Sequence, residues 1–491
     1  MPDGTPAAGR GTEEIVVIGG GIAGLVTALD LARAGLRPVV LEASPTVGGV
    51  VSAHQVGGLT LDAGAESFAT GRPAVTELVT ELGLAEHISL PNPVGAWVRH
   101  RAGSAPLPAT GFLGIPGRPW AADVRRVIGL PGVLRCAADA VLPTRSGLAN
   151  GTTLGGLVRS RMGRRVLDRL VEPVAGGVYA TDPDTLEVQN VAPGLSPAMV
   201  RAGSLAGAAR LLRGGGERSG SAVSTLTGGL HTVLAPLVQA IRDAGGEVRT
   251  AAPVAGLVRT ATGWRAELAG GPSALSARAV VVAVPARVAA SLLGTAHPGL
   301  AVQVLDAPIT PVLICTLVLD DHRLDAAPRG TGVLVSTHAT GVRAKALTHA
   351  TAKWPWLADA AGPGRHVLRL SYGRGNAELP AAADLPDIAL RDAAELLGVD
   401  LAPAAVVDSS IVSWPSALPA PRPGHADAVH ALRAQLAQPG LALVGAAVAG
   451  SGLAGVVGDA RREAAALIKR LGDVASIASV VNPGGPDPAS R

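Results

Sequence analysis

The pattern of hydrophobic residues near the amino terminus predicts a strand, a helix and a second strand. Glu14 to Ile18 is rich in β-branched residues, Ile22 to Ala34 has helix-forming composition, and Pro38 to Leu41 is a second apolar run. Gly35 suits the position after a helix end, where a left-handed backbone is common. We therefore expect the chain to open with a βαβ unit and a parallel sheet.

The same kind of pattern predicts two groups of strands farther along the chain. Gly228 to Ala244 has apolar residues at helical spacing, and three runs after it are expected to rejoin the first sheet: Glu247 to Thr250, Ala252 to Arg259 and Ala279 to Val284. Four later runs predict an antiparallel sheet: Val312 to Leu319, Gly332 to Ser336, Ala344 to Thr348 and His366 to Tyr372. Ala442 to Val444 predicts a last strand, followed by a helix from about Asp459 to Leu471.

Few strands are predicted between these groups, because Pro and Gly interrupt Arg- and Ala-rich stretches from about Val94 to Gly220. The expected fold class is α/β plus α+β, which suits a chain of 491 residues. The expected parts are a discontinuous nucleotide-binding domain (13–93, 222–298 and 436–475), a mostly helical insertion (94–221) and an antiparallel-sheet substrate domain (299–435). The tails 1–12 and 483–491 are expected to be disordered.

Composition excludes several classes of function. The net charge of +4 comes from scattered arginines, with no basic run interleaved with aromatic residues, so nucleic acid is not an expected partner. Two cysteines, Cys136 and Cys315, form no CxxC pair, and the eleven histidines form no metal-binding motif. Neither a disulfide framework nor a metal site is predicted.

Membrane insertion is not predicted either, although the mean hydropathy is +0.35. No uninterrupted apolar run reaches the roughly 18 residues that a spanning helix needs. The first twelve residues are polar and rich in Gly and Pro, unlike a signal peptide. We expect a cytoplasmic protein, for which peripheral membrane contact is neither required nor excluded.

The turn between the first strand and helix has the spacing of a dinucleotide site. Gly19 permits a tight turn, Gly21 lets the backbone approach a pyrophosphate, and Gly24 lets the helix pack on the strand. Glu42 follows the second strand, where a carboxylate accepts hydrogen bonds from ribose hydroxyls and repels a 2′-phosphate. NADP is therefore disfavoured. NAD remains the alternative to FAD. The Gly48-Gly49 pair favours FAD, because its bare backbone could approach a flavin ring or a pyrophosphate.

At this point the sequence resembles a known family, the flavoprotein oxidases of haem biosynthesis that act on protoporphyrinogen and coproporphyrinogen, and especially their soluble Gram-positive bacterial branch. Two of the motifs that carry the resemblance also fit many amine-oxidase-like flavoproteins: VVIGGGIAGL (Val16 to Leu25) and LEASPTVGG (Leu41 to Gly49). The others are LDAGAESF (Leu61 to Phe68), GGVYATDPDTL (Gly176 to Leu186), GGLHTVLAPL (Gly228 to Leu237), KALTHATAKWPWL (Lys345 to Leu357), SWPSALPAPRPGH (Ser413 to His425) and VGAAVAGSGLAGV (Val444 to Val456). Among these, GGVYATDPDTL, KWPWL and the segment from Trp414 to His425 resemble the porphyrinogen oxidases specifically.

The resemblance implies an amine-oxidase-like, Rossmann-type FAD domain and a set of FAD contacts. Residues 19 to 24 would hold the pyrophosphate: Gly19, Gly20, Gly21, Ile22, Ala23 and Gly24. Glu42 and Ala43 would hold the ribose, and Val254 would contact the adenine. Residues beside the flavin would be Gly48, Gly49, Gly64, Ala65, Glu66, Ser67, Trp414, Ser451, Gly452 and Leu453.

The motifs specify the substrate contacts less closely than the FAD contacts. Arg72, Arg343, Lys345 and Lys353 are candidates for pairing with substrate propionates, because a tetracarboxylate needs cationic partners. Tyr179 is either a substrate contact or a structural residue. Trp354, Trp356 and Trp414 either wall a macrocycle site or fill the core. No residue is nominated as a general acid or base, and His425 is interpreted as a loop histidine.

The resemblance implies FAD-dependent oxidation of coproporphyrinogen III to coproporphyrin III, with oxygen as electron acceptor and hydrogen peroxide as by-product. A ferrochelatase that receives the product is a candidate partner. Four alternatives stay open: protoporphyrinogen IX oxidation, a related flavin amine oxidase, a carotenoid desaturase, and a non-catalytic porphyrin-binding protein. The chain departs from the family pattern at Thr46-Val47, at Pro419 to Pro421 and at Ala454 to Val456, and the departure at Ala454 to Val456 suggests the last alternative.

Overall fold

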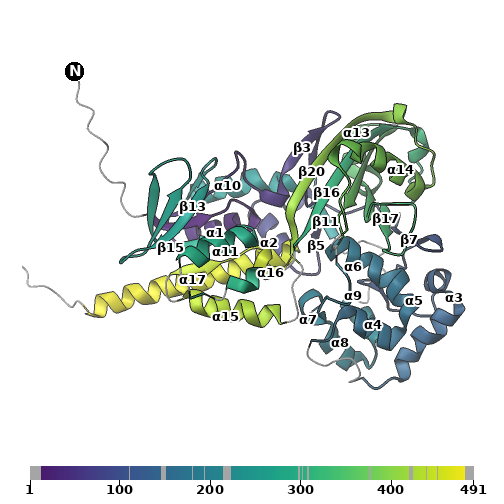
Figure 1. Ribbon diagram of the computed structural model, residues 1–491, viewed down its shortest axis with the longest axis horizontal. Coiled ribbons are helices and arrows are strands. Elements are labelled where there is room, and N and C mark those ends of the chain that lie inside the picture. The colour runs from purple at the N-terminus through teal and green to yellow at the C-terminus, as the bar shows by residue number, and fades with distance from the viewer. Residues whose placement is uncertain are drawn as a thin grey trace, which may run out of the picture. The chain divides into compact units, whose positions relative to one another are not determined.

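The structure is a computed structural model in which the chain divides into two compact units (Figure 1). It describes residues 13–109, 111–144, 151–179, 181–192, 194–213, 223–296, 299–300, 302–306, 309–374, 377–419, 424–437, 440–450 and 452–481. The first unit comprises Met1–Gly49, Val233–Asp306 and Asp427–Arg491, and the second comprises Val50–Thr232 and Ala307–Ala426. The tails predicted to be disordered lie outside the described residues.

The first unit is built on a twisted sheet with a parallel centre. Five parallel strands lie in the order β12 (Glu247–Arg249), β2 (Pro38–Leu41), β1 (Glu13–Ile18), β15 (Ala274–Val282) and β21 (Leu441–Leu443). Antiparallel strands β14 (Trp264–Leu268) and β13 (Val254–Arg259) extend it beside the first half of β15. Strands of a parallel sheet are buried on both faces, which explains why β1 and β2 are continuous apolar runs.

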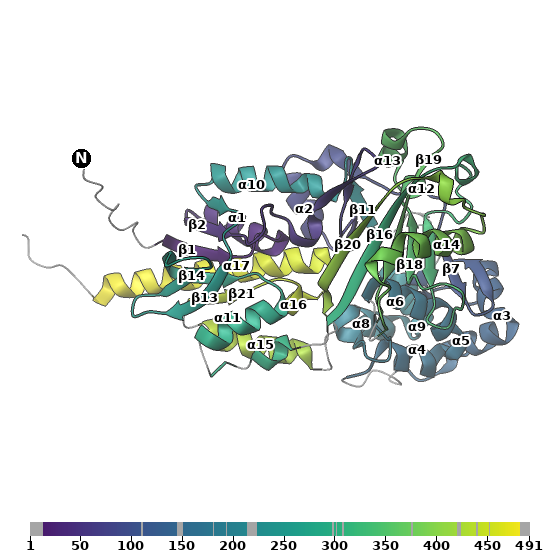
Figure 2. The same cartoon turned by 45° about the horizontal axis from the view of Figure 1, so that its top comes forward.

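Helices cover the sheet of this unit. Helix α1 (Ile22–Arg33) is buried along almost its whole length, and it packs against α17 (Leu453–Val481) and α10 (Leu234–Asp243) (Figure 2). Apolar residues lie on almost every side of α1, and a helix of this kind is stable only when it is buried. The remaining helices are α11 (Ala286–Ala296), α15 (His425–Ala437) and α16 (Ala446–Ala449). Helix α17 begins before Asp459 and continues beyond Leu471, the predicted ends.

The second unit contains a seven-stranded sheet. Its strands lie in the order β20 (Val406–Pro419), β16 (Ile309–Asp320), β19 (Arg365–Tyr372), β18 (Ala346–His349), β17 (Gly332–Val335), β7 (Trp97–His100) and β8 (Gly103–Pro106). All neighbours are antiparallel except β17 and β7. Helices α12 (Ala350–Lys353), α13 (Pro355–Ala361) and α14 (Leu385–Leu397) pack on it. The four predicted strands of this sheet are all present.

Smaller elements complete this part of the second unit. They are β3 (Ala53–Val56), β4 (Leu59–Asp62), β5 (Phe68–Ala69), α2 (Ala74–Glu81), β6 (Ile88–Ser89) and β11 (Val223–Leu226). Strands β3 and β4 form a hairpin, and β3 contacts β16 and β20. Because of these contacts, residues 50–93 are grouped with the second unit, whereas the sequence assigned them to the nucleotide-binding domain. The three-part division made from the sequence therefore stays a proposal.

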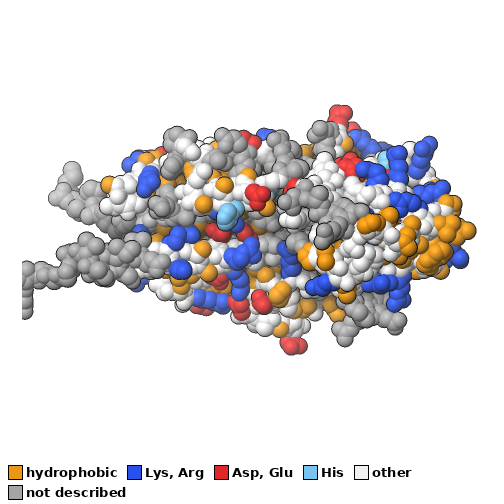
Figure 3. Space-filling model, turned by 90° about the horizontal axis from the view of Figure 1, so that it is seen from below, with side chains coloured by type: hydrophobic (Ala, Val, Ile, Leu, Met, Phe, Trp, Pro, Cys, Tyr) orange, Lys and Arg blue, Asp and Glu red, His pale blue; other side chains and the backbone are white. Residues whose placement is uncertain are grey.

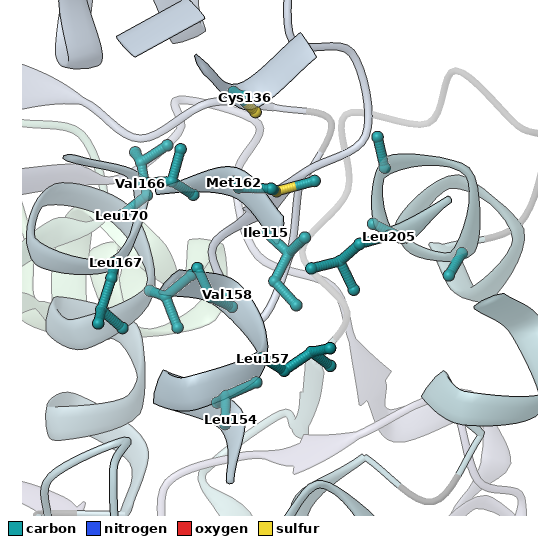
Figure 4. Packing of buried hydrophobic residues seen from close by; sticks show 14 of the residues in the cluster. Ile115, Cys136, Leu154, Leu157, Val158, Met162, Val166, Leu167, Leu170 and Leu205 are labelled. Carbon is teal, nitrogen blue, oxygen red and sulfur yellow. The ribbon is translucent and has the colours of Figure 1, made fainter. Parts of the chain in front are cut away.

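A layer of helices follows β8. It contains β9 (Gly111–Phe112), β10 (Ile115–Pro116), α3 (Ala122–Ala137), α4 (Leu154–Met162), α5 (Arg164–Val166), a π-helical turn (Leu167–Val171), α6 (Glu172–Tyr179), α7 (Val188–Val191), α8 (Leu195–Ala202) and α9 (Leu205–Arg213). Figure 4 shows its core, in which Ile115, Val158 and Leu205 point toward one another. The expected helical character is observed, but β7 and β8 also lie within residues 94–221 and belong to the large sheet.

Several exposed apolar side chains belong to this helical layer. Trp120, Leu130, Leu134 and Val141 are each more than half exposed, with Val141 at 84%. Figure 3 shows an apolar area at one end of the molecule, with Lys and Arg side chains around it. Within the described part of the chain, no helix is long and apolar enough to cross a membrane. In the same residues, no three His, Cys, Asp or Glu side chains are grouped as metal ligands would be.

A buried ion pair fixes the helical layer. Arg161 of α4 and Asp139 are each 1% exposed, and the Arg161 Nε donates to the Asp139 carboxylate. The second carboxylate oxygen accepts a 2.9 Å hydrogen bond from the Ala206 N–H at the start of α9. Arg161 also donates to the Pro143 carbonyl at 2.8 Å. One carboxylate thus joins α4, α9 and the segment between α3 and α4.

We predict that Asp139→Ala lowers the free energy of unfolding by about 3–5 kcal/mol, because it leaves the Arg161 charge buried without its partner. Urea denaturation followed by far-UV circular dichroism measures the loss. The control is Arg164→Ala, which removes a pair whose arginine is 78% exposed and which is expected to cost less than about 1 kcal/mol. Equal losses in the two variants would show that the buried pair has no special role.

Candidate functional site

The glycine turn after β1 requires glycine for steric reasons. A Cβ on Gly24 would lie 2.0 Å from the Gly19 carbonyl oxygen, far inside van der Waals contact. Gly19 itself has φ of 107°, a conformation that side chains disfavour, and a Cβ there would meet the Ala283 carbonyl at 2.4 Å. The helix is thereby brought close to the strand. This geometry agrees with the roles that the sequence assigned to Gly19 and Gly24.

No side chain of the described residues caps the amino terminus of α1. Gly21 occupies the N-cap position without a side-chain hydrogen bond, and the first turn holds no acidic residue. Ile22 and Ala23 are nonetheless buried, at 6% and 5% exposed. Buried N–H groups at a helix start need an acceptor, and the helix dipole favours an anion. A Cβ on Gly21 would meet nothing within 4 Å, so the turn leaves open space where a pyrophosphate fits.

Glu42 lies directly beside this turn. Its Oε2 accepts a 2.7 Å hydrogen bond from the Gly20 N–H, and its Oε1 accepts one of 2.8 Å from the Ser44 N–H. The carboxylate is therefore held at the end of β2 with lone pairs left for further donors. Ala43 follows it on the exposed side. A ribose diol is a ligand of suitable chemistry for this position.

Two further predicted segments are brought to the same place. The Gly48 N–H donates to the Gly20 carbonyl at 2.8 Å, and Gly48 forms an isolated bridge with Gly21. A Cβ on Gly49 would lie 3.6 Å from the Gly21 Cα. Val254 begins β13, directly after backbone that hydrogen-bonds to Glu42: the Ala252 N–H donates to the Glu42 carbonyl at 2.8 Å. Most of the predicted nucleotide contacts of the first unit thus lie around one turn.

The carboxyl-terminal segment also returns to α1. Strand β21 ends beside β15, and a Cβ on Gly445 would lie 3.9 Å from the Ala23 Cβ. Gly445 was not among the predicted contacts, although it belongs to the VGAAVAGSGLAGV motif. Leu453 begins α17, and Gly452 accepts the backbone hydrogen bond of Val456 at 3.0 Å. Ser451, predicted to contact the flavin, lies outside the described residues.

In the second unit, Gly64 and Trp414 are neighbours. A Cβ on Gly64 would lie 2.3 Å from the Val50 carbonyl oxygen and 3.1 Å from Trp414 Cζ2. The Trp414 indole N–H donates to the Ala63 carbonyl at 3.1 Å, and the Ala65 N–H donates to the Val50 carbonyl at 2.8 Å. Strand β20 thus fixes the loop after β4 through the Trp414 hydrogen bond. Strand β20, which carries Trp414, was not among the predicted strands.

Glu66 is the centre of a charged cluster in that loop. Lys353 Nζ donates to Glu66 Oε1 at 2.7 Å, and Arg369 Nη1 donates to Oε2. Arg369 also donates to the Gly64 carbonyl at 2.9 Å. Burial alone would raise the pKa of the Glu66 carboxyl, but Lys353 and Arg369 outweigh it and lower the pKa to about 2. The carboxylate is ionised, and the cluster carries a net positive charge.

Two members of this neighbourhood were missed from the sequence. Arg369 lies in a strand that was predicted, and a lone cation within the apolar run of β19 is the signal that would have found it. His54 on β3 bonds to Ser410 at 3.2 Å, and its Nε2 is buried with no partner among the described residues. Burial and the nearby Arg369 lower the pKa of His54, which favours a neutral imidazole. No sequence motif marks it.

Asp62, within LDAGAESF, joins that motif to GGLHTVLAPL. Its carboxylate accepts hydrogen bonds of 2.9 Å from the N–H groups of both Leu230 and His231. It also contacts His231 Nδ1 at 2.8 Å. The loop before Glu66 is therefore fixed by a carboxylate placed at the start of a short helix, where a negative charge is favoured.

The remaining candidates for substrate contacts lie at different places in the second unit. Tyr179 donates to the Val191 carbonyl at 3.3 Å, which supports a structural role. Arg72 is exposed, and Lys345 is buried beside Arg374 rather than in the Glu66 cluster. Trp354, 2% exposed, packs in a core cluster against which Trp356 also packs, so these two fill the core. Of the three tryptophans, Trp414 lies in the candidate site.

The chain is similar to known flavoproteins over most of its length. Residues 22–468 match the family described as flavin containing amine oxidoreductase. The chain is 32% identical over 468 residues to the coproporphyrinogen III oxidase of Mycobacterium tuberculosis, covering 93% of this chain and 97% of that protein. It is 27% identical to the coproporphyrinogen III oxidase of Bacillus subtilis, with 90% and 95% covered.

Solved structures give the same grouping. A protein of Exiguobacterium sp. 255-15, described as a candidate protoporphyrinogen oxidase, matches with a TM-score of 0.80 and 26% identity, covering 94% of this chain and all of that one. Cyclohexylamine oxidase of Brevibacterium oxydans matches with a TM-score of 0.66 at 17% identity, over 94% of this chain and all of that one. The second likeness concerns the fold alone.

We predict that Gly24→Ala abolishes retention of FAD, because the added Cβ forces α1 away from the turn that receives the pyrophosphate. The ratio of flavin to protein absorbance after purification measures the loss. Gly294→Ala is the matched control: this helical glycine of α11 has Val302 Cγ2 at 3.9 Å from an added Cβ, an ordinary contact. A Gly24→Ala protein that stayed fully yellow would contradict the assignment.

We predict that Glu66→Gln lowers the free energy of unfolding by about 3–5 kcal/mol at neutral pH, since Lys353 and Arg369 lose their counter-charge. In the native protein the depressed pKa of Glu66 contributes stability that is lost as the pH falls from about 4.5 towards 2. The variant lacks this contribution, so its stability should change less over that window. Urea midpoints across pH measure both effects.

The control for this prediction is Glu395→Gln, which alters a pair whose carboxylate is 48% exposed. Such a pair is expected to contribute less than about 1 kcal/mol. If Glu66→Gln behaved like Glu395→Gln, the charged cluster would be of no importance to the loop.

Proposed function

Because the chain belongs to the flavin-containing amine oxidoreductase family, and within it to the group of coproporphyrinogen and protoporphyrinogen oxidases, we propose that it oxidises coproporphyrinogen III to coproporphyrin III. The chain is an FAD-dependent oxidoreductase. The observation that carries the choice of substrate is the similarity, over almost the entire chain, to relatives named coproporphyrinogen III oxidase.

The reaction removes six hydrogens, as six electrons and six protons, from the reduced tetrapyrrole. Bound FAD supplies the two-electron chemistry, in three rounds per porphyrin. The protein supplies binding, orientation and electrostatics. We infer that oxygen is the final acceptor and that three molecules of hydrogen peroxide form for each porphyrin, which balances the six electrons.

The residues of the first unit are suited to the ADP part of FAD. The uncapped start of α1 offers N–H groups to the pyrophosphate, and Gly21 leaves room for it. Glu42 offers carboxylate oxygens to the ribose hydroxyls, and the backbone at Val254 lies next to that end of the site. Gly445, Gly452 and Leu453 place further backbone near the same helix.

The residues of the second unit are suited to the reacting ring. We infer that Gly64 to Ser67 lie against the flavin, with Trp414 providing an apolar wall. The net positive charge of Lys353 and Arg369 around Glu66 favours an anion nearby, as the reduced flavin is. Burial and the nearby Arg369 lower the pKa of His54, so its imidazole stays neutral in this neighbourhood, and its buried Nε2 has no partner among the described residues.

Three further proposals concern the surroundings of the enzyme. We propose that the product is handed to a ferrochelatase, since a free porphyrin needs metal insertion. Peripheral contact with a membrane would use the exposed apolar residues of the helical layer. A cytoplasmic location fits a chain whose described helices include no membrane-spanning one.

The assay that tests the proposal incubates the purified yellow protein aerobically with coproporphyrinogen III or with protoporphyrinogen IX. We predict a rise in porphyrin fluorescence that is faster with coproporphyrinogen III, with three peroxides released for each porphyrin. A heat-inactivated sample controls for spontaneous oxidation. A protein that binds FAD and leaves both porphyrinogens unchanged, or whose flavin is reduced by a simple amine instead, would refute the proposal.

A further inference from the structure

Lys345 is a buried cation without a counter-ion. The residue immediately before β18 is 4% exposed, and its ammonium group has no hydrogen bond or ion pair within the described part of the chain; the Nζ is not one of the fully enclosed unpartnered atoms, so a ligand can reach it. Its backbone is fixed on both sides, because the Lys345 N–H donates to the Ser371 carbonyl at 2.8 Å and its carbonyl accepts from the Val335 N–H at 3.0 Å. An unpaired buried ammonium is costly, so its presence points to a ligand of opposite charge.

Arg374 is a second cation at the same place. Its Nη2 donates to the carbonyl of Val335 and, at 3.2 Å, to that of Lys345. The side chain is 16% exposed and follows the end of β19. Two cations therefore meet at the ends of neighbouring strands, and burial together with the Arg374 charge lowers the pKa of Lys345 to about 8.

Available carboxylates do not neutralise this pair. Glu172 of α6 lies 3.7 Å from Arg374 Nη1, too long for a hydrogen bond, and its oxygens accept from the Thr337 N–H at 3.1 and 3.2 Å. Asp392 of α14 is engaged by the N–H groups of Arg343 and Ala344 and by the Tyr372 hydroxyl. The site keeps one positive charge more than its carboxylate can balance.

A glycine of α6 lies close to this site. A Cβ on Gly176 would lie 3.4 Å from the Glu172 carboxylate and 3.8 Å from the Arg374 guanidinium, which are ordinary contacts, so the backbone of α6 lies beside this cation. Gly176 lies in GGVYATDPDTL and Lys345 lies in KALTHATAKWPWL, two of the motifs that carry the resemblance to the porphyrinogen oxidases. Both motifs converge on this one site.

We propose that Lys345 and Arg374 form a carboxylate subsite that binds one propionate of the porphyrinogen. The inference rests on the proposed function for the identity of the ligand. Arg369 of the Glu66 cluster lies on β19, and Arg374 lies two residues beyond the end of that strand. This strand therefore links the Glu66 cluster to the two cations of the subsite.

Lys345→Met tests the subsite, because it keeps the length of the side chain and removes its charge. A charge-assisted hydrogen bond to a carboxylate corresponds to about 10-fold to 100-fold in affinity. We expect KM for coproporphyrinogen III to rise by about that factor with kcat changed less than about twofold, and Lys345→Arg to restore most of the affinity. The control is Lys469→Met on exposed α17, with KM unchanged.

Binding of the product separates this inference from the proposed function. Fluorescence titration of the FAD-loaded protein with coproporphyrin III should show the same loss in Lys345→Met, whereas the tetramethyl ester of coproporphyrin III should bind native protein and variant equally. This measurement needs no turnover, so a protein that binds the acid but oxidises neither porphyrinogen refutes the function and leaves the subsite standing. Equal binding of the acid by native protein and Lys345→Met refutes the subsite.

The variant Glu172→Gln is expected to change the affinity for coproporphyrin III in the opposite direction to Lys345→Met. Removing this negative charge while keeping an acceptor for the Thr337 N–H should tighten coproporphyrin III binding about two- to fivefold, which a purely structural role would not produce. Affinity of the native protein should also fall as the pH rises above about 8, where Lys345 loses its proton, and this fall should be absent in Lys345→Arg. Weaker binding in Glu172→Gln, or an identical pH profile in Lys345→Arg, would contradict the subsite.

Discussion

The first unit is organised around the start of helix α1. This helix begins within the core, and the N–H groups of its first turn have no side-chain acceptor among the residues that the structure describes. A soluble fold tolerates this arrangement when a ligand completes it. The two tight glycine contacts, at Gly19 and Gly24, bring the helix to that position, and Glu42 and the Gly48 bridge are fixed to the same turn. The need to place an anion at the start of α1 therefore explains why these residues are glycine and glutamate.

The second unit uses charge differently. Around Glu66, two cations hold one carboxylate so that the loop after β4 has a single conformation, while Trp414 closes it from a distant strand. At Lys345, by contrast, two cations meet without adequate neutralisation. The first arrangement stabilises the protein by itself. The second is favourable when a ligand brings a negative charge, which is the behaviour expected of a recognition site rather than of a structural ion pair.

Local patterns predicted the parts of the fold that depend on local constraints. The glycine spacing, the strands β1 and β2 and the antiparallel strands β16 to β19 follow from residues close together in the chain, and all are present. Strands β7 and β8 were missed because their sequences, WVRH and GSAP, contain a charged residue, Gly and Pro and form no continuous apolar run. The His54 and Gly445 neighbourhoods depend on contacts between distant segments, so no spacing rule finds them. The resemblance to a known family supplied Gly64 and Trp414, which the residue pattern alone did not.

Both sheets depend on partners that are far apart in the chain. Strand β1 pairs with β15, which in turn pairs with β21 (Leu441–Leu443), and β7 pairs with the much later β17. During synthesis, the apolar strands at the amino terminus are therefore made hundreds of residues before the sheet can close around them. Such strands present unpaired edges to other nascent chains. The discontinuous architecture that assembles this nucleotide site thus makes productive folding dependent on completion of translation, and truncated products of this chain are expected to aggregate rather than to form a partial enzyme.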